Sequence, residues 1–485
     1  MEKNKKGLSA WQLTMMALGT VIGGSFFVGS SVAIRAAGPS IMIAYVLGGI
    51  LVYFILIALS EMTVANPDSG SFRTFAEQAF GRGIGFIVGW VYWTGMVLAM
   101  SSEATAVSIL VSKWIPNISI PLLGGAVIIG VTLINLLGAD KLSKLESGLA
   151  AVKLFAIASF IVIAALLVLG IAFQTPAIGA GELSREPFMT GGIKGIAGSM
   201  LIVMFSYAGF EIIGLAASES ENPRKTVPQA ILYTILSLVG FYILSMAFLF
   251  PLIPAKNIKE DVSPMVAALN YQGIGWGSTA LNIVMITAII STMLAAMFGL
   301  GRMMRSLVSE GHAPNWLKDK TDVPYRGILF SGSAMLLGLG IGIFLPQIYL
   351  FLISSGGFAL LFTYVMIMAA HIRLRKRNGC PPEGKCQMPG FPYTSWFSLI
   401  SMIVIILSMP FIPGQVSGLI AGFTIIAVYS LIYIAIRLAG HSKEKKPFTK
   451  DLSEQEYTSM LSREFSEELI KPRKEEKNNG SEDEM

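Results

Sequence analysis

Apolar segments long enough to cross a lipid bilayer recur along most of this chain. One helical span needs about 20 predominantly apolar residues. Charged residues make up only 14% of the 485 residues, against about 25% in soluble proteins. The sequence therefore predicts an all-α integral membrane protein with twelve transmembrane helices. These fall at roughly 10–36, 38–61, 84–112, 118–138, 147–173, 195–217, 228–253, 278–301, 327–345, 347–371, 395–412 and 416–437.

The Lys and Arg residues between the apolar segments predict the orientation. Twelve spans put both termini on one side of the membrane, together with nineteen of the basic residues in or beside the loops. Basic residues accumulate in cytoplasmic loops, so both termini are expected in the cytoplasm, with the protein in the cell membrane. This distribution accounts for the net charge of +6, and no nucleic-acid partner is expected. The opposite side holds six: Arg35, Lys113, Arg185, Lys194, Lys256 and Lys259.

Two of the apolar segments contain glycine-rich interruptions, one at Gly23-Gly24-Ser25 and one between Ser206 and Gly209. Glycine leaves the helical conformation at little steric cost. Inside a membrane the freed backbone groups are tolerated only where they line a cavity or bind something. A pair of interruptions at matching positions in two halves of a chain indicates the binding site of a secondary transporter.

The interruptions lie in the first and sixth spans, and an offset of five spans inverts the second unit relative to the first. This predicts an inverted 5+5 repeat with two accessory helices. The expected organisation is a cytoplasmic N-terminus, a first repeat of spans 1–5, a second of spans 6–10, accessory spans 11–12 and a charged cytoplasmic tail. Their bounds are 1–9, 10–173, 195–371, 395–437 and 438–485.

The interruptions also predict the chemistry of a ligand. A half-helix that begins near Ser25 points free N–H groups and a positive dipole end into the membrane centre, which suits a carboxylate. Free carbonyls between Ser206 and Gly209 suit an ammonium group. Together they form a backbone cradle for the part that all α-amino acids share. The alternative is that these glycines only let helices pack closely.

Three ionisable residues lie deep inside apolar segments: Glu103, Lys153 and Glu211. A charge at the bilayer centre costs at least about 2.5–3.5 kcal/mol, so each is a functional candidate. Glu103 either exchanges a proton or contacts the substrate, or it only pairs with a buried donor. Glu211 is expected to pin the interrupted helix by bonding to its backbone, with proton transfer as the alternative. Lys153 is a coupling residue or an anchor that reaches the interface.

The segment from Phe205 to Pro228 resembles, almost position by position, the sixth span and following loop of the amino acid permeases. These belong to the amino acid–polyamine–organocation superfamily, and the similarity is to its bacterial amino acid transporter branch over about 8–440. Supporting matches are Pro67-Asp68-Ser69-Gly70-Ser71, Gly89-Trp90-Val91-Tyr92-Trp93 and Ser309-Glu310-Gly311-His312-Ala313-Pro314. The first interruption departs from the family's G-[ST]-G, and Ser291-Thr292-Met293-Leu294-Ala295 replaces its S-x-N-S.

The resemblance implies roles for particular residues. The backbone at Gly24 and Ser25, next to Gly23, would bind the substrate carboxylate. Phe205 matches an aromatic gate. Lys153 occupies the place where sodium-coupled relatives bind their ion, and Glu103 has a carboxylate counterpart in proton-coupled relatives. The substrate amine would meet carbonyls beside Gly209, near Val21, Phe205 and Ala208.

The expected function is secondary active, proton-coupled uptake of an amino acid, with a neutral one favoured by the apolar wall at Met293–Ala295. Obligate exchange and amino acid sensing are the alternatives, and no enzyme activity is expected. The chain contains no phosphate-binding G-x-x-x-x-G-K-[ST] motif, which disfavours ATP-driven transport. No cofactor or metal is expected. Cys380 and Cys386 have no zinc-type partners nearby and are expected as two reduced thiols.

Overall fold

The computed structural model describes residues 9–65, 71–137, 139–171, 176–211, 213, 223–260, 262–319, 323–343, 348–380 and 386–439. The expected N-terminal segment before Ser9, the motif residues 66–70 and 214–222, and the tail from residue 440 onward lie outside this part. The chain divides into two compact units, Met1–Tyr433 and Ile434–Met485, and the packing described below belongs to the first.

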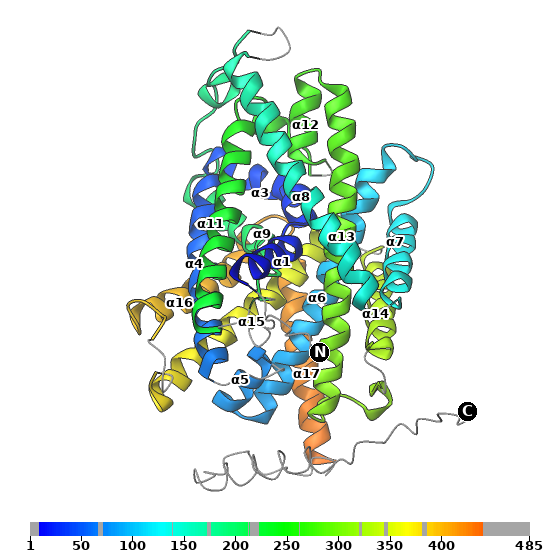
Figure 1. Ribbon diagram of the computed structural model, residues 1–485, viewed down its shortest axis with the longest axis vertical. Helices are drawn as coiled ribbons and strands as arrows, with labels where there is room; N and C mark the ends of the chain where they lie inside the picture. The colour runs from blue at the N-terminus through cyan, green and yellow to red at the C-terminus, as the bar shows by residue number, and fades with distance from the viewer. Residues whose placement is uncertain are drawn as a thin grey trace, which may run out of the picture. The chain divides into compact units, whose positions relative to one another are not determined.

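All regular structure in the described residues is helical (Figure 1). The α-helices of the first half are α1 (Ala10–Val21), α2 (Gly24–Phe27), α3 (Ser30–Ala37), α4 (Ile41–Ala65), α5 (Ser71–Phe80), α6 (Arg82–Ser112), α7 (Ile120–Asn135) and α8 (Ala139–Leu169). Those of the second half are α9 (Gly192–Ser206), α11 (Pro223–Leu249), α12 (Pro264–Tyr271), α13 (Gly275–Ser309), α14 (Tyr325–Ile343), α15 (Ile348–Asn378), α16 (Tyr393–Ser408) and α17 (Val416–Leu438). Short 3-10 turns join several of them.

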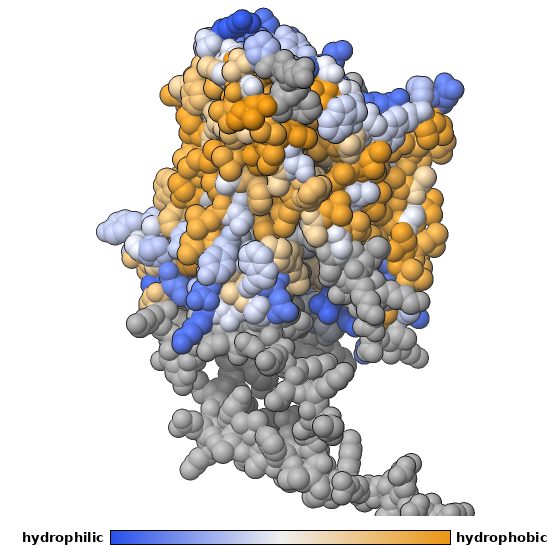
Figure 2. All heavy atoms as spheres, turned by 45° about the horizontal axis from the view of Figure 1, so that its top comes forward, coloured by the Kyte–Doolittle hydropathy of each residue, from blue (hydrophilic) through white to orange (hydrophobic). Residues whose placement is uncertain are grey.

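Within the described residues, eight helical segments are long and apolar enough to cross a membrane: Gly24–Thr63, Arg82–Ser112, Ala151–Leu169, Lys225–Leu249, Gly275–Ser309, Ile348–Asn378, Tyr393–Phe411 and Val416–Leu438. Three shorter apolar helices accompany them, namely Ile120–Asn135, Gly192–Ser206 and Tyr325–Ile341. Figure 2 shows a band of apolar surface between hydrophilic ends. Exposed side chains such as Leu236 and Leu337 belong to that apolar surface, as expected where lipid replaces water.

The helix α6 is the packing centre of the first unit. It contacts α5, α7, α13, α14 and α15, and most of its residues are buried, as expected for a helix enclosed by others. Small residues bring α6 and α15 together, since an added Cβ at Gly95 would lie 2.6 Å from the Ala359 Cβ and one at Gly356 would lie 3.0 Å from the Ala99 nitrogen. This close approach fixes the part of α6 that carries Glu103, one turn after Ala99.

A charged network ties α5 to the loop after α13. The Arg73 guanidinium is fully buried and lies 3.1 Å from the Glu77 carboxylate and 3.6 Å from that of Glu310. Glu77 also lies 3.0 Å from the His312 ring nitrogen. Burial opposes the charged form of Glu77, but bonding to His312 and the positive charges around it hold the pKa of this carboxyl below its usual value. The network joins segments far apart in sequence.

The expectation of two reduced thiols at Cys380 and Cys386 is wrong for this structure, which joins them as a disulfide. Their Cα atoms lie 5.5 Å apart, within the range that a disulfide bridges. The expectation rested on the reducing cytoplasm and took no account of how closely the chain returns after Cys380.

Candidate functional site

The first interruption is present where the glycines predict it. Helix α1 ends at Val21 and α2 begins at Gly24. The backbone nitrogens that open α2 donate to one side chain: the Gly24 nitrogen lies 2.6 Å from Oε2 of Glu103, and the Ser25 nitrogen lies 3.1 Å from Oε1. Glu103 is 3% exposed. A buried carboxylate of the protein therefore occupies the N–H pair at which the sequence predicts a substrate carboxylate.

The second interruption meets the first. Helix α9 ends at Ser206, and Gly209 has a φ of 106°, which favours glycine. A Cβ at Gly209 would lie 2.9 Å from the Thr20 carbonyl oxygen. Two hydroxyls join the segments, since Thr20 donates to the Gly209 carbonyl at 3.1 Å and Ser206 donates to the Ser25 carbonyl at 3.2 Å. The two breaks thus form one buried polar site.

Lys153 closes the site from α8. Its ammonium donates to the Gly19 carbonyl, and it lies 2.7 Å from the Thr292 hydroxyl. Thr292 in turn donates to the Ile22 carbonyl at 2.9 Å. Lys153 is fully buried, so the alternative of an anchor reaching the interface is wrong. The Lys153 ammonium thus joins α8 to the end of α1.

Glu211 holds the second break in shape. Its carboxylate accepts from the Gly209 nitrogen at 3.0 Å, from the Tyr92 hydroxyl at 3.2 Å and from the Tyr364 hydroxyl at 3.4 Å. These donors come from the interruption itself, from α6 and from α15. The contact to Gly209 is the one expected of a residue that pins the interrupted helix.

Aromatic side chains surround α2. The rings of Phe26 and Tyr242 stack with centroids 4.1 Å apart, and Tyr45 lies 5.1 Å from Tyr242. The Tyr242 hydroxyl donates to the Ser206 carbonyl at 2.7 Å, so one of the carbonyls expected to be free at the second break already has a donor.

The remaining predicted residues lie at the two breaks. Val21 and Gly23 are buried beside the end of α1, Phe205 is buried in the last turn of α9, and Ala208 is partly buried after it. Sequence reasoning missed Thr292 and Tyr242 as partners of the breaks. A polar group inside an apolar segment was the available signal for both.

Phe205 gives a first test of the site. Phe205→Ala should weaken uptake of all substrates by a similar factor, about 10–100-fold, because a buried phenyl ring contributes about 1.5–3 kcal/mol and hydrogen-bonds to none of them. Phe205→Trp should be milder. Initial uptake rates for several amino acids measure this. A change confined to one substrate would make Phe205 part of the side-chain pocket instead of a gate.

Fold and site define a helical membrane protein whose two broken helices meet at a buried polar centre. Residues 12–452 match the family model described as amino acid permease. The chain is 33% identical to the uncharacterized amino acid permease YvbW of Bacillus subtilis, over 91% of this chain and 98% of that protein. It is 33% identical to the gamma-aminobutyric acid permease of Escherichia coli, over 84% of this chain and 89% of that protein. It is 31% identical to the aromatic amino acid transport protein AroP of Escherichia coli, over 85% of this chain and 92% of that protein. The chain belongs to the amino acid permease family.

Proposed function

We propose that this protein is a secondary active transporter that couples uptake of an amino acid to protons, by alternating access across the cell membrane. The observation that carries the proposal is the position of the Glu103 carboxylate on the N–H groups of Gly24 and Ser25. Two N–H groups that bind a side-chain carboxylate have the geometry and partial positive charge needed to bind the carboxylate of an amino acid.

Coupling follows from competition for these two donors. The substrate carboxylate and the Glu103 carboxylate cannot both accept from the same N–H pair. When substrate binds, Glu103 loses its donors in a low-dielectric interior, where an unpaired charge is costly, and it takes up a proton. When substrate leaves, Glu103 releases the proton and returns to the N–H groups. One proton thus accompanies each amino acid.

The same arrangement favours uptake over obligate exchange. A carrier with an empty cradle would have to reorient with two unsatisfied N–H groups in its interior, which opposes the return step. Glu103 satisfies these groups in the substrate-free protein, so the return step needs no second amino acid. Exchange remains the competing mechanism, and sensing without transport is the further alternative.

Lys153 makes sodium unnecessary in this mechanism. Its ammonium rests on the Gly19 carbonyl and next to Thr292, where it holds α8 against the end of α1 and against α13. The fixed positive charge takes the place of a sodium ion in sodium-coupled relatives.

The rest of the substrate is placed by the second break. Its amine would meet carbonyls near Val21, Phe205 and Ala208, with Phe205 covering it. Buried hydroxyls with no hydrogen-bond partner in the described structure, those of Tyr349 and Ser291, are available to a ligand. The neighbouring apolar residues of α13 favour a neutral amino acid. Gamma-aminobutyric acid and aromatic amino acids, which the names of two relatives give, belong in the test panel.

The proposed architecture is twelve spans in an inverted 5+5 repeat, 10–173 and 195–371, with 395–437 as accessory helices. The 40-residue apolar segment Gly24–Thr63 is too long for one span of about 20 residues. Helix lengths also repeat, with α4 to α8 measuring 25, 10, 31, 16 and 31 residues and α11 to α15 measuring 27, 8, 35, 19 and 31.

Helix contacts support the same symmetry, because they occur in matched pairs. α6 packs on α15 as α13 packs on α8, α6 packs on α14 as α13 packs on α7, and α1 packs on α11 as α9 packs on α4. Two units related by an inverting two-fold axis require such pairs.

With both termini cytoplasmic, the basic end of α15 also lies in the cytoplasm.

Transport of radiolabelled amino acids by the purified protein in proteoliposomes tests the function. A panel of unlabelled competitors should reveal a neutral amino acid that competes fully. Substrate binding in detergent without any uptake into vesicles would favour the sensor over the transporter.

A further inference from the structure

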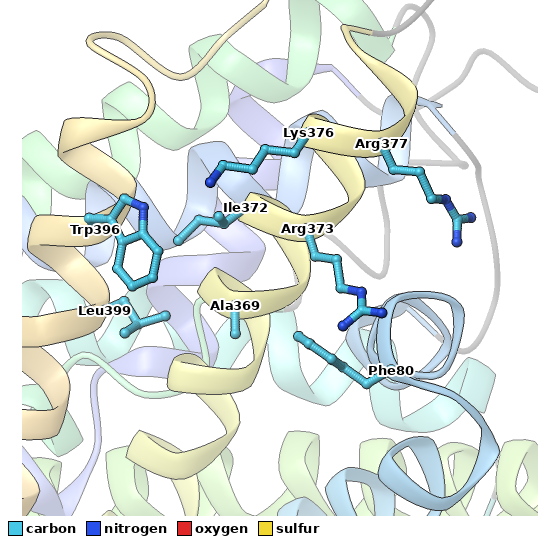
Figure 3. Close-up of a pocket in the computed structure, with 8 residues that line it drawn as sticks. All are labelled: Phe80, Ala369, Ile372, Arg373, Lys376, Arg377, Trp396 and Leu399. Atoms are coloured by element: carbon cyan, nitrogen blue, oxygen red, sulfur yellow. The ribbon is translucent and has the colours of Figure 1, made fainter.

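A groove of about 560 Å³ opens on the outside of the protein, away from the broken helices. Figure 3 shows that the C-terminal half of α15 forms its centre, with Trp396 and Leu399 of α16 on one side and Phe80 of α5 on the other. The groove is large enough to hold part of a small amphipathic molecule.

The groove has a charged rim. Arg373, Lys376 and Arg377 line it, all three are exposed, and none of its lining residues is acidic. The Arg373 guanidinium lies 5.1 Å from the centre of the Phe80 ring, which holds it at one wall. Lys376 extends toward the Trp396 side (Figure 3). A ligand between these walls meets positive charge from both.

Below the charges the groove is apolar. Ala369, Ile372 and Leu399 form this part of the lining. Trp396 is 44% exposed, and Tyr393, one turn earlier at the start of α16, is 82% exposed. Tryptophan and tyrosine gather where hydrocarbon meets the headgroups. The boundary between the basic rim and the apolar lining of the groove therefore lies at the level of a lipid's glycerol region.

We infer that this groove binds an anionic glycerophospholipid, with the headgroup phosphate on Arg373 and Lys376 and an acyl chain along Ala369 and Leu399. Basic pockets between membrane helices at the cytoplasmic face recognise such lipids. Free phosphate would use the rim and leave the apolar part empty, and a zwitterionic lipid would gain little from three positive charges. The inference rests on the proposed cytoplasmic position of the α15 end and does not depend on the transported substrate.

The test is a titration of the full-length protein in detergent, with bound lipid counted by native mass spectrometry. The probes are phosphatidylglycerol, phosphatidylcholine of the same acyl chains, and glycerol 3-phosphate. Each basic side chain near an anionic lipid is worth roughly fivefold in affinity, so the triple variant R373Q/K376Q/R377Q should bind phosphatidylglycerol on the order of 100-fold more weakly. Ala369→Trp should weaken it as well by filling the apolar part.

The matched control is K225Q/R302Q/K318Q, which removes the same charge from exposed positions elsewhere in the described structure. It should retain wild-type affinity, and the wild type should bind phosphatidylglycerol but neither phosphatidylcholine nor glycerol 3-phosphate with comparable affinity. Equal losses in the two triple variants would overturn the site, because general surface charge would then explain the binding. Comparable binding of glycerol 3-phosphate would make it a phosphate site, and comparable binding of phosphatidylcholine would remove the role of charge. Either result overturns the inference.

Discussion

Gly24→Leu is expected to abolish substrate binding. An added Cβ at Gly24 would lie 2.6 Å from Oε2 of Glu103 and 3.0 Å from the Ala106 Cβ, so the leucine side chain fills the space through which a carboxylate reaches the N–H groups. Hydrogen bonds to a charged group are worth about 1.5–3 kcal/mol each, and losing two should reduce affinity by at least about 100-fold. Calorimetry on the folded protein measures this.

Gly240→Leu is the matched control. Gly240 also lies inside a helix, α11, and an added Cβ there would meet nothing within 4 Å. The control should bind substrate as the wild type does and should unfold at a similar temperature. Unchanged affinity in Gly24→Leu would remove the first interruption from the substrate site.

Lys153→Ala is expected to eliminate net uptake and leave the protein folded. The substitution removes the ammonium from the Gly19 carbonyl and from Thr292, so nothing positive holds α8 to the break. An unsatisfied buried carbonyl costs about 1–3 kcal/mol, which lowers the unfolding temperature without preventing folding. Uptake into proteoliposomes and circular dichroism measure the two effects separately.

Lys153→Met keeps most of the side-chain volume and removes the charge, so it should fail in uptake as the alanine variant does. Lys225→Ala, at an exposed lysine of α11, should transport normally. Full activity in Lys153→Ala would contradict the role of the ammonium.

The sequence predicts the positions of the breaks because adjacent glycines leave the helical conformation at little steric cost, and it predicts the candidate ionisable residues because a charge is costly inside an apolar segment. Gly23 and Gly24 lie where α1 stops and α2 starts, and Gly209 takes up a positive φ just after α9. The same cost singles out Glu103, Lys153 and Glu211. In the structure, each of these side chains forms a hydrogen bond with backbone at one of the breaks.

The partners of these residues could not be predicted, because they depend on how distant helices pack. Glu103 and Gly24 are 79 positions apart, and Lys153 and Thr292 are 139 apart. The sequence therefore left the cradle open for substrate, whereas the structure fills it with Glu103. It also treated Thr292 only as part of a replaced motif.

Periodicity is a weaker guide to the fold outside the apolar runs. The short helices α5 and α12 between long ones were not predicted, since each has fewer than eleven residues; α5 is amphipathic and α12 begins at a proline. The two short helices occupy corresponding places in the proposed repeats, and this correspondence can be recognised only when the order of all helices is known. The pairing of Cys380 with Cys386 likewise depends on a chain path that spacing alone does not define.

The central claim is that Glu103 and the substrate carboxylate alternate on the Gly24 and Ser25 N–H groups, with a proton taken up by Glu103. Uptake into proteoliposomes in sodium-free choline buffer, with the inside alkaline, tests it most directly in the wild type and Glu103→Gln. A glutamine side chain cannot take up the proton. We predict that the wild type accumulates amino acid without sodium, while Glu103→Gln exchanges preloaded amino acid but does not accumulate it. Strict sodium dependence of the wild type, or equal accumulation by Glu103→Gln, would contradict the account.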